Sequence, residues 1–237
     1  MNLAGAIALI TGAGRGIGRT LALTLARNGT EVVLTARTKS ELDLVRNEIT
    51  SEGGKAQTLE GDLTNDRDIE RMFRHIRETF GRLDILVNNA GIGRFAPIKD
   101  LAVHEFDAMW NLNMRALFLC TQQALPLMIP QRRGAIVNIS SLAGKNAFVG
   151  GGGYSATKWA LLGFSKTLML EVREHNIRVV TICPGSVDTT FSPAANDPTR
   201  SEKIIHPQDI ADTLITVLTL PDRTMVSEID IRPTNPK

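Results

Sequence analysis

The sequence predicts an α/β fold: one domain over residues 1–237, with a doubly wound, mostly parallel sheet of seven strands in three layers. Short apolar runs alternate with amphipathic stretches from one end of the chain to the other. Such strand–helix alternation produces parallel strands with helices on both faces of the sheet. The length of 237 residues also suits one large α/β domain.

Seven runs have the length and apolar content of short buried strands, and many of them are rich in Val and Ile. The expected strands cover residues 7–11, 31–36, 56–60, 83–88, 135–140, 178–183 and 226–231. Helical patterns separate them, so consecutive strands are expected to run in the same direction.

The clearest helical pattern is DIERMFRHIRETF, residues 68–80, whose apolar residues recur with a period of 3.6. Asn65 or Asp66 is expected to cap this helix, because short polar side chains accept hydrogen bonds from the free N–H groups of a first turn. Gly81 is expected to end it, because glycine adopts the left-handed conformation that follows many helices.

Two further helices and one irregular stretch complete the expected elements. A long helix is expected over much of residues 104–129, bent or broken by Pro126. Another helix follows Pro207. The irregular residues 186–205 follow a strand, where ligands bind in such sheets, so they are either a substrate loop or a plain surface loop.

Composition excludes several classes of partner. With 27 basic and 25 acidic residues, a net charge of +2 gives no strong attraction to nucleic acid or an anionic membrane. Cys120 and Cys183 lie in apolar runs, which favours buried thiols over a disulfide. No run is long enough to span a membrane, so a cytoplasmic location is expected. No metal site is expected, because the four histidines are scattered: His75, His104, His175 and His206.

A glycine motif follows the first strand, in TGAGRGIG at residues 11–18. The common G-x-G-x-x-G pattern fails at Ile17, but G-x-x-x-G-x-G fits Gly12, Gly16 and Gly18. Glycines let the backbone approach a pyrophosphate, and the helix that follows offers free N–H groups and a positive dipole end. A nucleotide-binding loop is favoured over a merely tight turn because of this position between strand and helix.

The end of the second strand favours NADP over NAD. An NAD site requires an acid there for the ribose hydroxyls, whereas this chain has Ala36 followed by Arg37. Arg15, inside the glycine loop, reaches the same region. Two guanidinium groups and no carboxylate suit a 2′-phosphate, although two solvent-facing arginines are the plain alternative.

A candidate catalytic pair stands at the start of YSATKWALLGFSKTL. Tyr154 and Lys158 are four residues apart and therefore share one helix face. An ammonium favours the phenolate, so we expect Lys158 to lower the pKa of Tyr154 and make it a general acid–base. The spacing alone often occurs by chance, but Ser141 ends a strand thirteen residues earlier and Asn113 lies in the long central helix.

These motifs, in this order and spacing, resemble the short-chain dehydrogenase/reductase family over nearly the whole chain, and so imply a Rossmann-type fold. The resemblance identifies Asn113, Ser141, Tyr154 and Lys158 as a catalytic tetrad. It also implies that NNAG, from Asn88, stabilises the sheet and contacts the cofactor. The cofactor-binding residues that the motifs and the resemblance predict are Gly12, Gly14, Arg15, Gly16, Ile17, Gly18, Arg37, Asp62, Leu63, Asn89, Ala90, Gly91, Tyr154, Lys158, Pro184, Gly185, Val187 and Thr189.

The resemblance implies reversible hydride transfer between nicotinamide and a carbonyl. Tyr154 gives the proton, Ser141 orients the oxygen, Lys158 holds the ribose, and Asn113 supports a water in the proton relay. A non-catalytic NADP-binding regulator is the rival on the same fold. A serine acyl-transferase, suggested by Ser-x-x-Lys in SATK, is disfavoured because Ser-Asp-Asn and Lys-Thr-Gly are missing.

The substrate is left open between a 3-oxoacyl thioester of a carrier protein and a small ketone, sugar or quinone. Arg132, Arg173 and His175 lie near positions where carrier-protein reductases place basic docking residues. The resemblance also implies a homodimer or homotetramer, but the chain lacks the usual Gly-Gly after the last strand. The four glycines at 150–153 are interpreted as room for a bulky substrate, or as a mobile loop.

Overall fold

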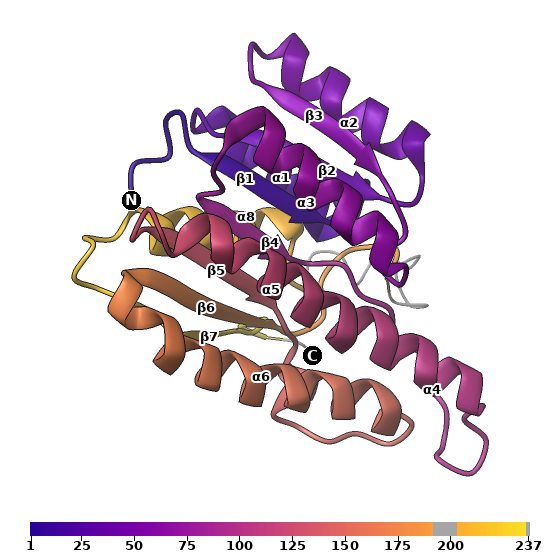
Figure 1. Cartoon of the computed structure of the whole chain (residues 1–237). Helices are drawn as coiled ribbons and strands as arrows, with labels where there is room; N and C mark the ends of the chain where they lie inside the picture. Colours follow the sequence, from indigo (N-terminus) through magenta and orange to yellow (C-terminus); the bar gives the residue numbers. More distant parts are fainter. Residues whose placement is uncertain (192–202, 236–237) are drawn as a thin grey trace.

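The computed structural model describes residues 1–191 and 203–235 and confirms the α/β fold (Figure 1). Within these residues one sheet of seven strands has the order β3-β2-β1-β4-β5-β6-β7, and each neighbouring pair is parallel. The strands are β1 (Ile7–Thr11), β2 (Glu31–Ala36), β3 (Ala56–Glu60), β4 (Ile85–Asn88), β5 (Gly134–Ile139), β6 (Ile177–Pro184) and β7 (Glu228–Ile231).

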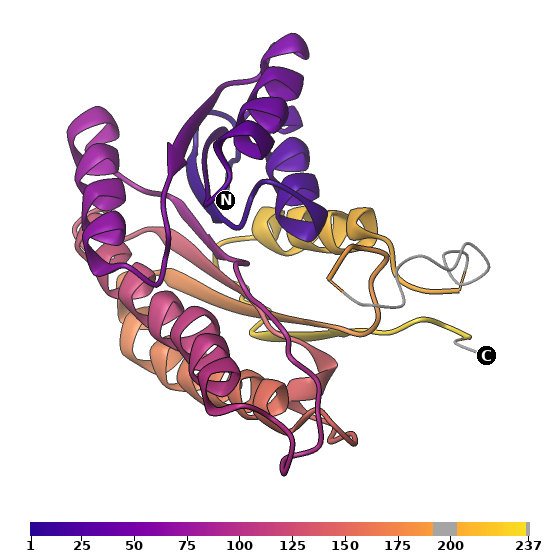
Figure 2. The same ribbon diagram turned by 90° about the vertical axis from the view of Figure 1, so that its right-hand side faces the viewer.

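The helices lie on both faces of the sheet, so that Figures 1 and 2 show three layers. Buried residues of α1, α2 and α8 pack on one face, and those of α3, α5 and α6 pack on the other. The α-helices are α1 (Gly16–Arg27), α2 (Lys39–Ser51), α3 (Asp66–Phe80), α4 (Val103–Trp110), α5 (Leu117–Met128), α6 (Gly152–Val172) and α8 (Pro207–Thr219). Short π or 3₁₀ segments are η1 (Asn111–Ala116), η2 (Leu142–Gly144) and η3 (Arg173–His175).

The alternation of side chains along each strand builds this arrangement. In β1, Ala8 and Ile10 pack against α1 and its neighbours, while Ile7 and Leu9 pack on the opposite face. Because successive strand residues point to opposite faces, a strand that is apolar throughout requires cover on both sides. Helix α3 supplies part of that cover with its apolar stripe, which includes the fully buried Phe73.

The caps predicted for α3 are confirmed. The Asn65 side-chain oxygen accepts a hydrogen bond from the Arg67 N–H at 3.1 Å. Gly81 follows the helix with a φ of 64°, in the left-handed region. These two residues fix where α3 begins and ends, and the segment after β3 therefore enters the helix at a defined angle.

The long central helix differs from the prediction. Pro126 lies inside α5, which continues to Met128, so of the two expected outcomes, a bend or a break, the break does not occur. A proline two residues before a helix end removes only one intrahelical hydrogen bond. The departure from α-helical geometry lies instead in η1, which is π-helical and contains Asn113. Such π segments are frequent at functional sites.

The topology fixes where a ligand site can lie. The chain builds β1, β2 and β3 toward one side of the sheet and then returns to place β4 on the other side of β1. In doubly wound sheets, ligands bind outside the carboxyl ends of the strands at this switch point.

Cys120 and Cys183 are free and buried, as predicted. Among the residues that the structure describes, no helix has the length and apolar content that crossing a membrane requires.

Candidate active site

The glycine loop between β1 and α1 has the backbone geometry of a phosphate cradle. Gly12 and Gly16 have φ values of 65° and 54°, which favour glycine. A Cβ atom on Gly18 would lie 2.2 Å from the Gly12 carbonyl oxygen, so the first turn of α1 can pack this closely only with glycine there. The free N–H groups at the start of α1 are thereby available to an anion, which is how a dinucleotide pyrophosphate binds.

The segment after β4 is tied to the glycine loop. The Asn89 side-chain amide donates to the carbonyl oxygens of Thr11 and Gly12 at 2.8 and 3.2 Å. The backbone N–H groups of Asn89 and Ala90 donate to the Thr11 hydroxyl at 2.9 and 3.0 Å. Two predicted cofactor segments, far apart in sequence, therefore form one rigid unit. Thr11 is the first residue of the stretch TGAGRGIG, but its role as the link between the two segments was not predicted.

The segment after β6 also lies against the glycine loop, so that both border one crevice at the carboxyl ends of the strands. The Thr189 methyl group lies 3.4 Å from where a Cβ atom on Gly16 would stand. The Gly185 N–H donates to the Ile231 carbonyl oxygen at 2.9 Å, and Val187 pairs with Ile205 in an isolated parallel bridge. The expected substrate loop thus begins and ends beside the glycine loop, but its residues 192–202 lie outside the described residues.

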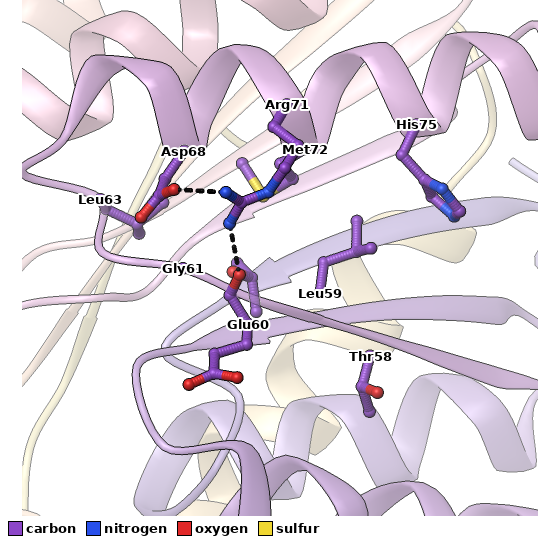
Figure 3. Close-up of a pocket in the computed structure, with 10 residues that line it drawn as sticks. Thr58, Leu59, Glu60, Gly61, Leu63, Asp68, Arg71, Met72 and His75 are labelled. Carbon is purple, nitrogen blue, oxygen red and sulfur yellow. Dashed lines mark hydrogen bonds and ion pairs between the residues drawn. The ribbon is translucent and has the colours of Figure 1, made fainter.

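The segment after β3 carries the two residues expected at the adenine. One oxygen of Asp62 accepts hydrogen bonds from the backbone N–H and the hydroxyl of Thr64 at 2.9 and 2.8 Å. Leu63 lines a cavity of about 260 Å³ between β3 and α3, shown in Figure 3. Arg71 crosses this cavity, pairing with Asp68 at 2.8 Å and donating to the Glu60 carbonyl oxygen at 2.9 Å. No member of the tetrad lines it, so it lies beside the catalytic region and not in it.

The two arginines that predicted a phosphate are accessible. Arg15 and Arg37 are both exposed, and neither side chain forms an ion pair or hydrogen bond within residues 1–191 and 203–235. Ala36, at the end of β2, supplies no carboxylate. The end of the crevice near β2 therefore presents two exposed guanidinium groups, which suit a phosphate better than a bare ribose diol. The Glu41 carboxylate also lies here, beside Gly14 of the glycine loop.

The catalytic candidates meet where β5 ends and α6 begins. Ser141 follows β5, and its hydroxyl lies close enough to the phenol of Tyr154, in the first turn of α6, to act on the pKa of that phenol. The Lys158 ammonium lies 5.7 Å from the centre of the Tyr154 ring and donates to the Ile139 carbonyl oxygen at 2.9 Å. Three members of the predicted tetrad are thus brought together, and both the tyrosine and the lysine are buried.

The protonation states differ from the expectation. Burial raises the pKa of the Tyr154 phenol to about 12, against a smaller lowering by the Ser141 hydroxyl. Burial also lowers the pKa of Lys158 to about 8. The prediction that Lys158 lowers the tyrosine pKa is therefore wrong for this geometry, because desolvation of the phenol dominates. At neutral pH the phenol carries its proton and the lysine is charged.

Asn113 connects the π segment η1 to this group. Its side-chain amide donates to the Ile92 carbonyl oxygen at 2.9 Å and to the Thr157 hydroxyl at 3.1 Å, and its oxygen accepts from the Ile92 N–H at 2.9 Å. Thr157 in turn donates to the Tyr154 carbonyl oxygen at 2.8 Å. Since both amide hydrogens are used, a water at Asn113 has to be held through an oxygen. Thr157 was not predicted, although it lies inside the Tyr–Lys motif.

The four glycines at 150–153 are packed against the chain itself. A Cβ atom on Gly151 would lie 2.3 Å from the Phe148 ring, and one on Gly152 would lie 2.4 Å from the Ile98 side chain. At Gly153 the nearest atom would be the terminal methyl of Met109, at 2.6 Å. The interpretation that the run leaves room for substrate is wrong at these three positions, because protein side chains fill the space.

The basic residues considered for carrier-protein docking lie elsewhere. Arg132 precedes β5 and donates to the Glu174 carbonyl oxygen at 2.8 Å, and Arg173 and His175 precede β6. Ser141 follows the opposite end of β5. Within one subunit the structure therefore does not bring these residues to the tetrad.

The chain is similar to known proteins in sequence and in structure. The sequence profile of the family described as short chain dehydrogenase matches residues 6–200. Sepiapterin reductase of Chlorobaculum tepidum is 36% identical over 236 residues, which cover 97% of this chain and 96% of the relative.

Two solved structures are similar over almost their whole length. A metagenomic short-chain oxidoreductase in complex with NADP is 38% identical, with a TM-score of 0.87 and 99% of each chain covered. An alcohol dehydrogenase from the archaeon Thermococcus sibiricus, complexed with 5-hydroxy-NADP, is 29% identical, with a TM-score of 0.91 and 97% of each chain covered.

Proposed function

The chain belongs to the short-chain dehydrogenase family, and we propose that it is an NADP(H)-dependent oxidoreductase that reversibly converts a carbonyl compound to an alcohol. The observation that carries the proposal is the buried Tyr154 phenol, beside Ser141 and one helical turn from Lys158, at the carboxyl edge of the sheet. The predicted cofactor segments surround the same crevice.

NADP(H) is the cofactor that the residues fit. Two solved relatives are described as complexes with NADP or 5-hydroxy-NADP. In this chain the glycine loop would hold the pyrophosphate, Arg15 and Arg37 the 2′-phosphate, and the free oxygen of Asp62 the adenine. The bound cofactor supplies the hydride that the protein's own side chains lack.

The chain's residues supply the proton and the positioning. Tyr154 is protonated at neutral pH and gives its proton to the carbonyl oxygen, while Ser141 holds that oxygen by a hydrogen bond. The carbonyl carbon gains a hydride and the oxygen gains the proton, so the product is an alcohol. Reduction at pH 7 therefore starts from the protonated phenol, and the reverse reaction starts from the phenolate.

Lys158 and Asn113 support the tyrosine. Two of the three ammonium hydrogens of Lys158 remain after its bond to Ile139 and would hold the ribose hydroxyls. A water held by an Asn113 oxygen would return a proton from solvent to Tyr154 through Lys158. The rival function, a non-catalytic NADP-binding regulator, is disfavoured because all four residues are present.

The substrate is a finer proposal. A 3-oxoacyl thioester is one candidate, and a small ketone, a sugar or a quinone are the others. Arg132 and His175 lie at the amino ends of β5 and β6, which does not support docking of a carrier protein beside Tyr154 of the same subunit. Residues 186–205 stay a candidate substrate loop, because the described part of this segment places Thr189 beside Gly16 and pairs Val187 with Ile205.

The assembly and location of the protein also stay proposals. We expect a homodimer or homotetramer in the cytoplasm, with a small-molecule or acyl-thioester substrate as the only other partner. The edge strand β7 is engaged internally, because Glu228 and Asp230 both pair with Lys145. Light scattering on the purified protein distinguishes the two assemblies.

A substrate panel tests the proposed function. Oxidation of NADPH is followed with acetoacetyl thioesters, quinones, aldehydes, ketosteroids, sugar ketones and sepiapterin, the last because a relative carries that name. Turnover with at least one carbonyl, and faster with NADPH than with NADH, is expected. Tight NADPH binding without turnover across the panel would instead favour the regulator.

A further inference from the structure

Two phenylalanine rings pack against the catalytic tyrosine and a third packs against one of them, each from a different segment. The ring centres of Phe95 and Phe191 lie 5.5 and 5.8 Å from that of Tyr154. The ring of Phe148 lies 5.9 Å from that of Phe95. Phe95 follows β4, Phe148 lies between η2 and α6, and Phe191 follows β6. We call Phe95, Phe148 and Phe191 the aromatic wall.

Glycines hold the aromatic wall in place. A Cβ atom on Gly93 would lie 2.7 Å from the tip of the Phe95 ring and 3.1 Å from that of Phe191. A Cβ atom on Gly151 would lie 2.3 Å from the tip of the Phe148 ring. Each ring therefore contacts the backbone of a glycine directly. A larger residue in place of Gly93 or Gly151 would displace the ring. Gly151, in the run 150–153, therefore leaves the space that the Phe148 ring occupies.

The aromatic wall is apolar and only half covered. Phe95, Phe148 and Phe191 are 43%, 47% and 45% exposed, whereas Tyr154 is only 7% exposed. Half-exposed rings from three segments, gathered in one place, are typical of a surface that a ligand covers. The phenol that donates the proton stands at its base, so a substrate that reaches Tyr154 also touches the wall.

The charges next to the aromatic wall are already paired. Arg94, adjacent to Phe95, pairs with Glu105 at 3.7 Å. Lys145, three residues before Phe148, pairs with Asp230 and Glu228. These cations are therefore poorly placed to hold the phosphate or carboxylate of a charged substrate. Apolar contact and ring packing are the interactions that the wall offers.

We propose that the aromatic wall makes this protein selective for carbonyl compounds that carry an aromatic ring close to the carbonyl group. An aromatic substituent can pack edge-to-face against Phe95 and Phe191, as the Tyr154 ring already does with Phe95. A saturated group of the same size covers the same surface but lacks the ring–ring term. The inference rests on the proposed function, since it names the substrate class of the same site.

Phenylacetone and cyclohexylacetone form a matched pair of test substrates. Both carry a six-membered ring, separated from the carbonyl by one methylene, so the carbonyl groups have similar intrinsic reactivity. We expect kcat/KM with NADPH to be about 10-fold higher for phenylacetone. Replacement of Phe95, Phe148 or Phe191 by leucine keeps apolar volume but removes the ring, and should lower this ratio by about 2- to 10-fold.

Phe118→Leu is the matched control. Phe118 is 45% exposed and also lies against another ring, that of Phe164 at 6.1 Å, but it belongs to α5 and not to the aromatic wall. The ratio should be unchanged in this variant. An equal kcat/KM for the two ketones in the wild-type enzyme, or a ratio that none of the three wall variants alters, would overturn the proposal.

A binding measurement separates this inference from the proposed function. Calorimetry on the NADPH-loaded Tyr154→Phe variant, which keeps the ring but not the hydroxyl, gives the affinity for each ketone without turnover. The aromatic wall is supported if Tyr154→Phe binds phenylacetone more tightly than cyclohexylacetone and if the double variant Tyr154→Phe/Phe95→Leu does not. This holds even if the wild-type enzyme reduces neither ketone. Equal binding of the two ketones refutes the wall even if turnover is fast.

Discussion

The two glycine-rich segments of this protein, residues 12–18 and 150–153, use glycine in different ways. In the first segment, backbone packs directly against backbone, because a Cβ atom on Gly18 would lie 2.2 Å from the Gly12 carbonyl oxygen. In the second, side chains occupy the space, led by the Phe148 ring on Gly151. One segment keeps backbone groups free for a ligand, and the other supports the protein's own side chains beside Tyr154.

The difference extends to the two halves of the crevice. The half around the glycine loop carries the exposed Arg15 and Arg37, with the Glu41 carboxylate beside Gly14. The half around the second segment is largely apolar, and the burial of Tyr154 and Lys158 there raises the pKa of the tyrosine and lowers that of the lysine. The two segments are both rich in glycine but lie in different surroundings. One borders the site of a charged cofactor, and the other lies near a proton donor that burial keeps neutral.

Among the glycine and charge variants, the largest expected effect on cofactor binding is that of Gly18→Ala. The new methyl group would meet backbone that cannot move without displacing β1, so we expect NADPH affinity to fall on the order of 100-fold. Fluorescence titration with NADPH measures it, with circular dichroism to check the fold. Gly163→Ala is the control, because Gly163 has open space around it in α6 and alanine favours the helix by up to about 1 kcal/mol. Unchanged NADPH affinity in Gly18→Ala would contradict the cradle.

The next effect concerns the charge of the first segment. Arg37→Ala should lower the ratio of kcat/KM for NADPH over NADH by about 10-fold or more, because one charge-assisted contact to the 2′-phosphate is lost. The exposed Arg223, outside the crevice, provides the control variant Arg223→Ala. A ratio that stays constant in Arg37→Ala would show that this arginine is only a surface charge.

Burial of Lys158 gives a pH-dependent prediction for the second half. Its pKa in the folded protein is lowered to about 8, so between pH 8 and 10 the unfolded chain binds more protons at this residue than the folded chain. Stability should therefore rise with pH in this window, by roughly 1 kcal/mol per pH unit, relative to Lys158→Met. At pH 7 and below, the difference between the two proteins should be nearly constant, because Lys158 is then protonated in both the folded and the unfolded chain. Urea unfolding of both apoproteins at pH 7, 8, 9 and 10 measures it, and parallel pH profiles would refute the burial.

A smaller effect is expected from Gly151→Ala. Its methyl group meets the tip of the Phe148 ring, which can swing aside, and not backbone. We expect kcat/KM for a ring-bearing ketone to change by about 2- to 5-fold, with NADPH affinity unaltered. Loss of NADPH affinity here would remove the distinction between the two segments.

Much of the fold followed from the sequence. The runs 7–11, 31–36 and 56–60 coincide with β1, β2 and β3, because short apolar runs between helical patterns leave little choice of structure. Strand ends were less well defined: β4 begins at Ile85, two residues later than expected, and β6 extends one residue further at each end. Hydrophobic pattern records which residues are buried, not where a hydrogen-bond ladder stops.

The site was partly predictable. Motif spacing placed Ser141, Tyr154 and Lys158, which the structure brings together. It did not predict the aromatic wall, because Phe95, Phe148 and Phe191 come from three segments that meet only in the folded chain. Nor did it predict the raised pKa of Tyr154, since desolvation depends on packing and not on the neighbouring residue in sequence.

The most direct test of the central claim is the Tyr154→Phe variant, assayed with NADPH and the best carbonyl substrate. The variant removes one hydroxyl and keeps the ring that packs against Phe95. We predict that kcat falls at least about 1,000-fold, while the Kd for NADPH changes less than about 3-fold. Near-wild-type turnover in this variant would contradict the assignment of Tyr154 as the proton donor.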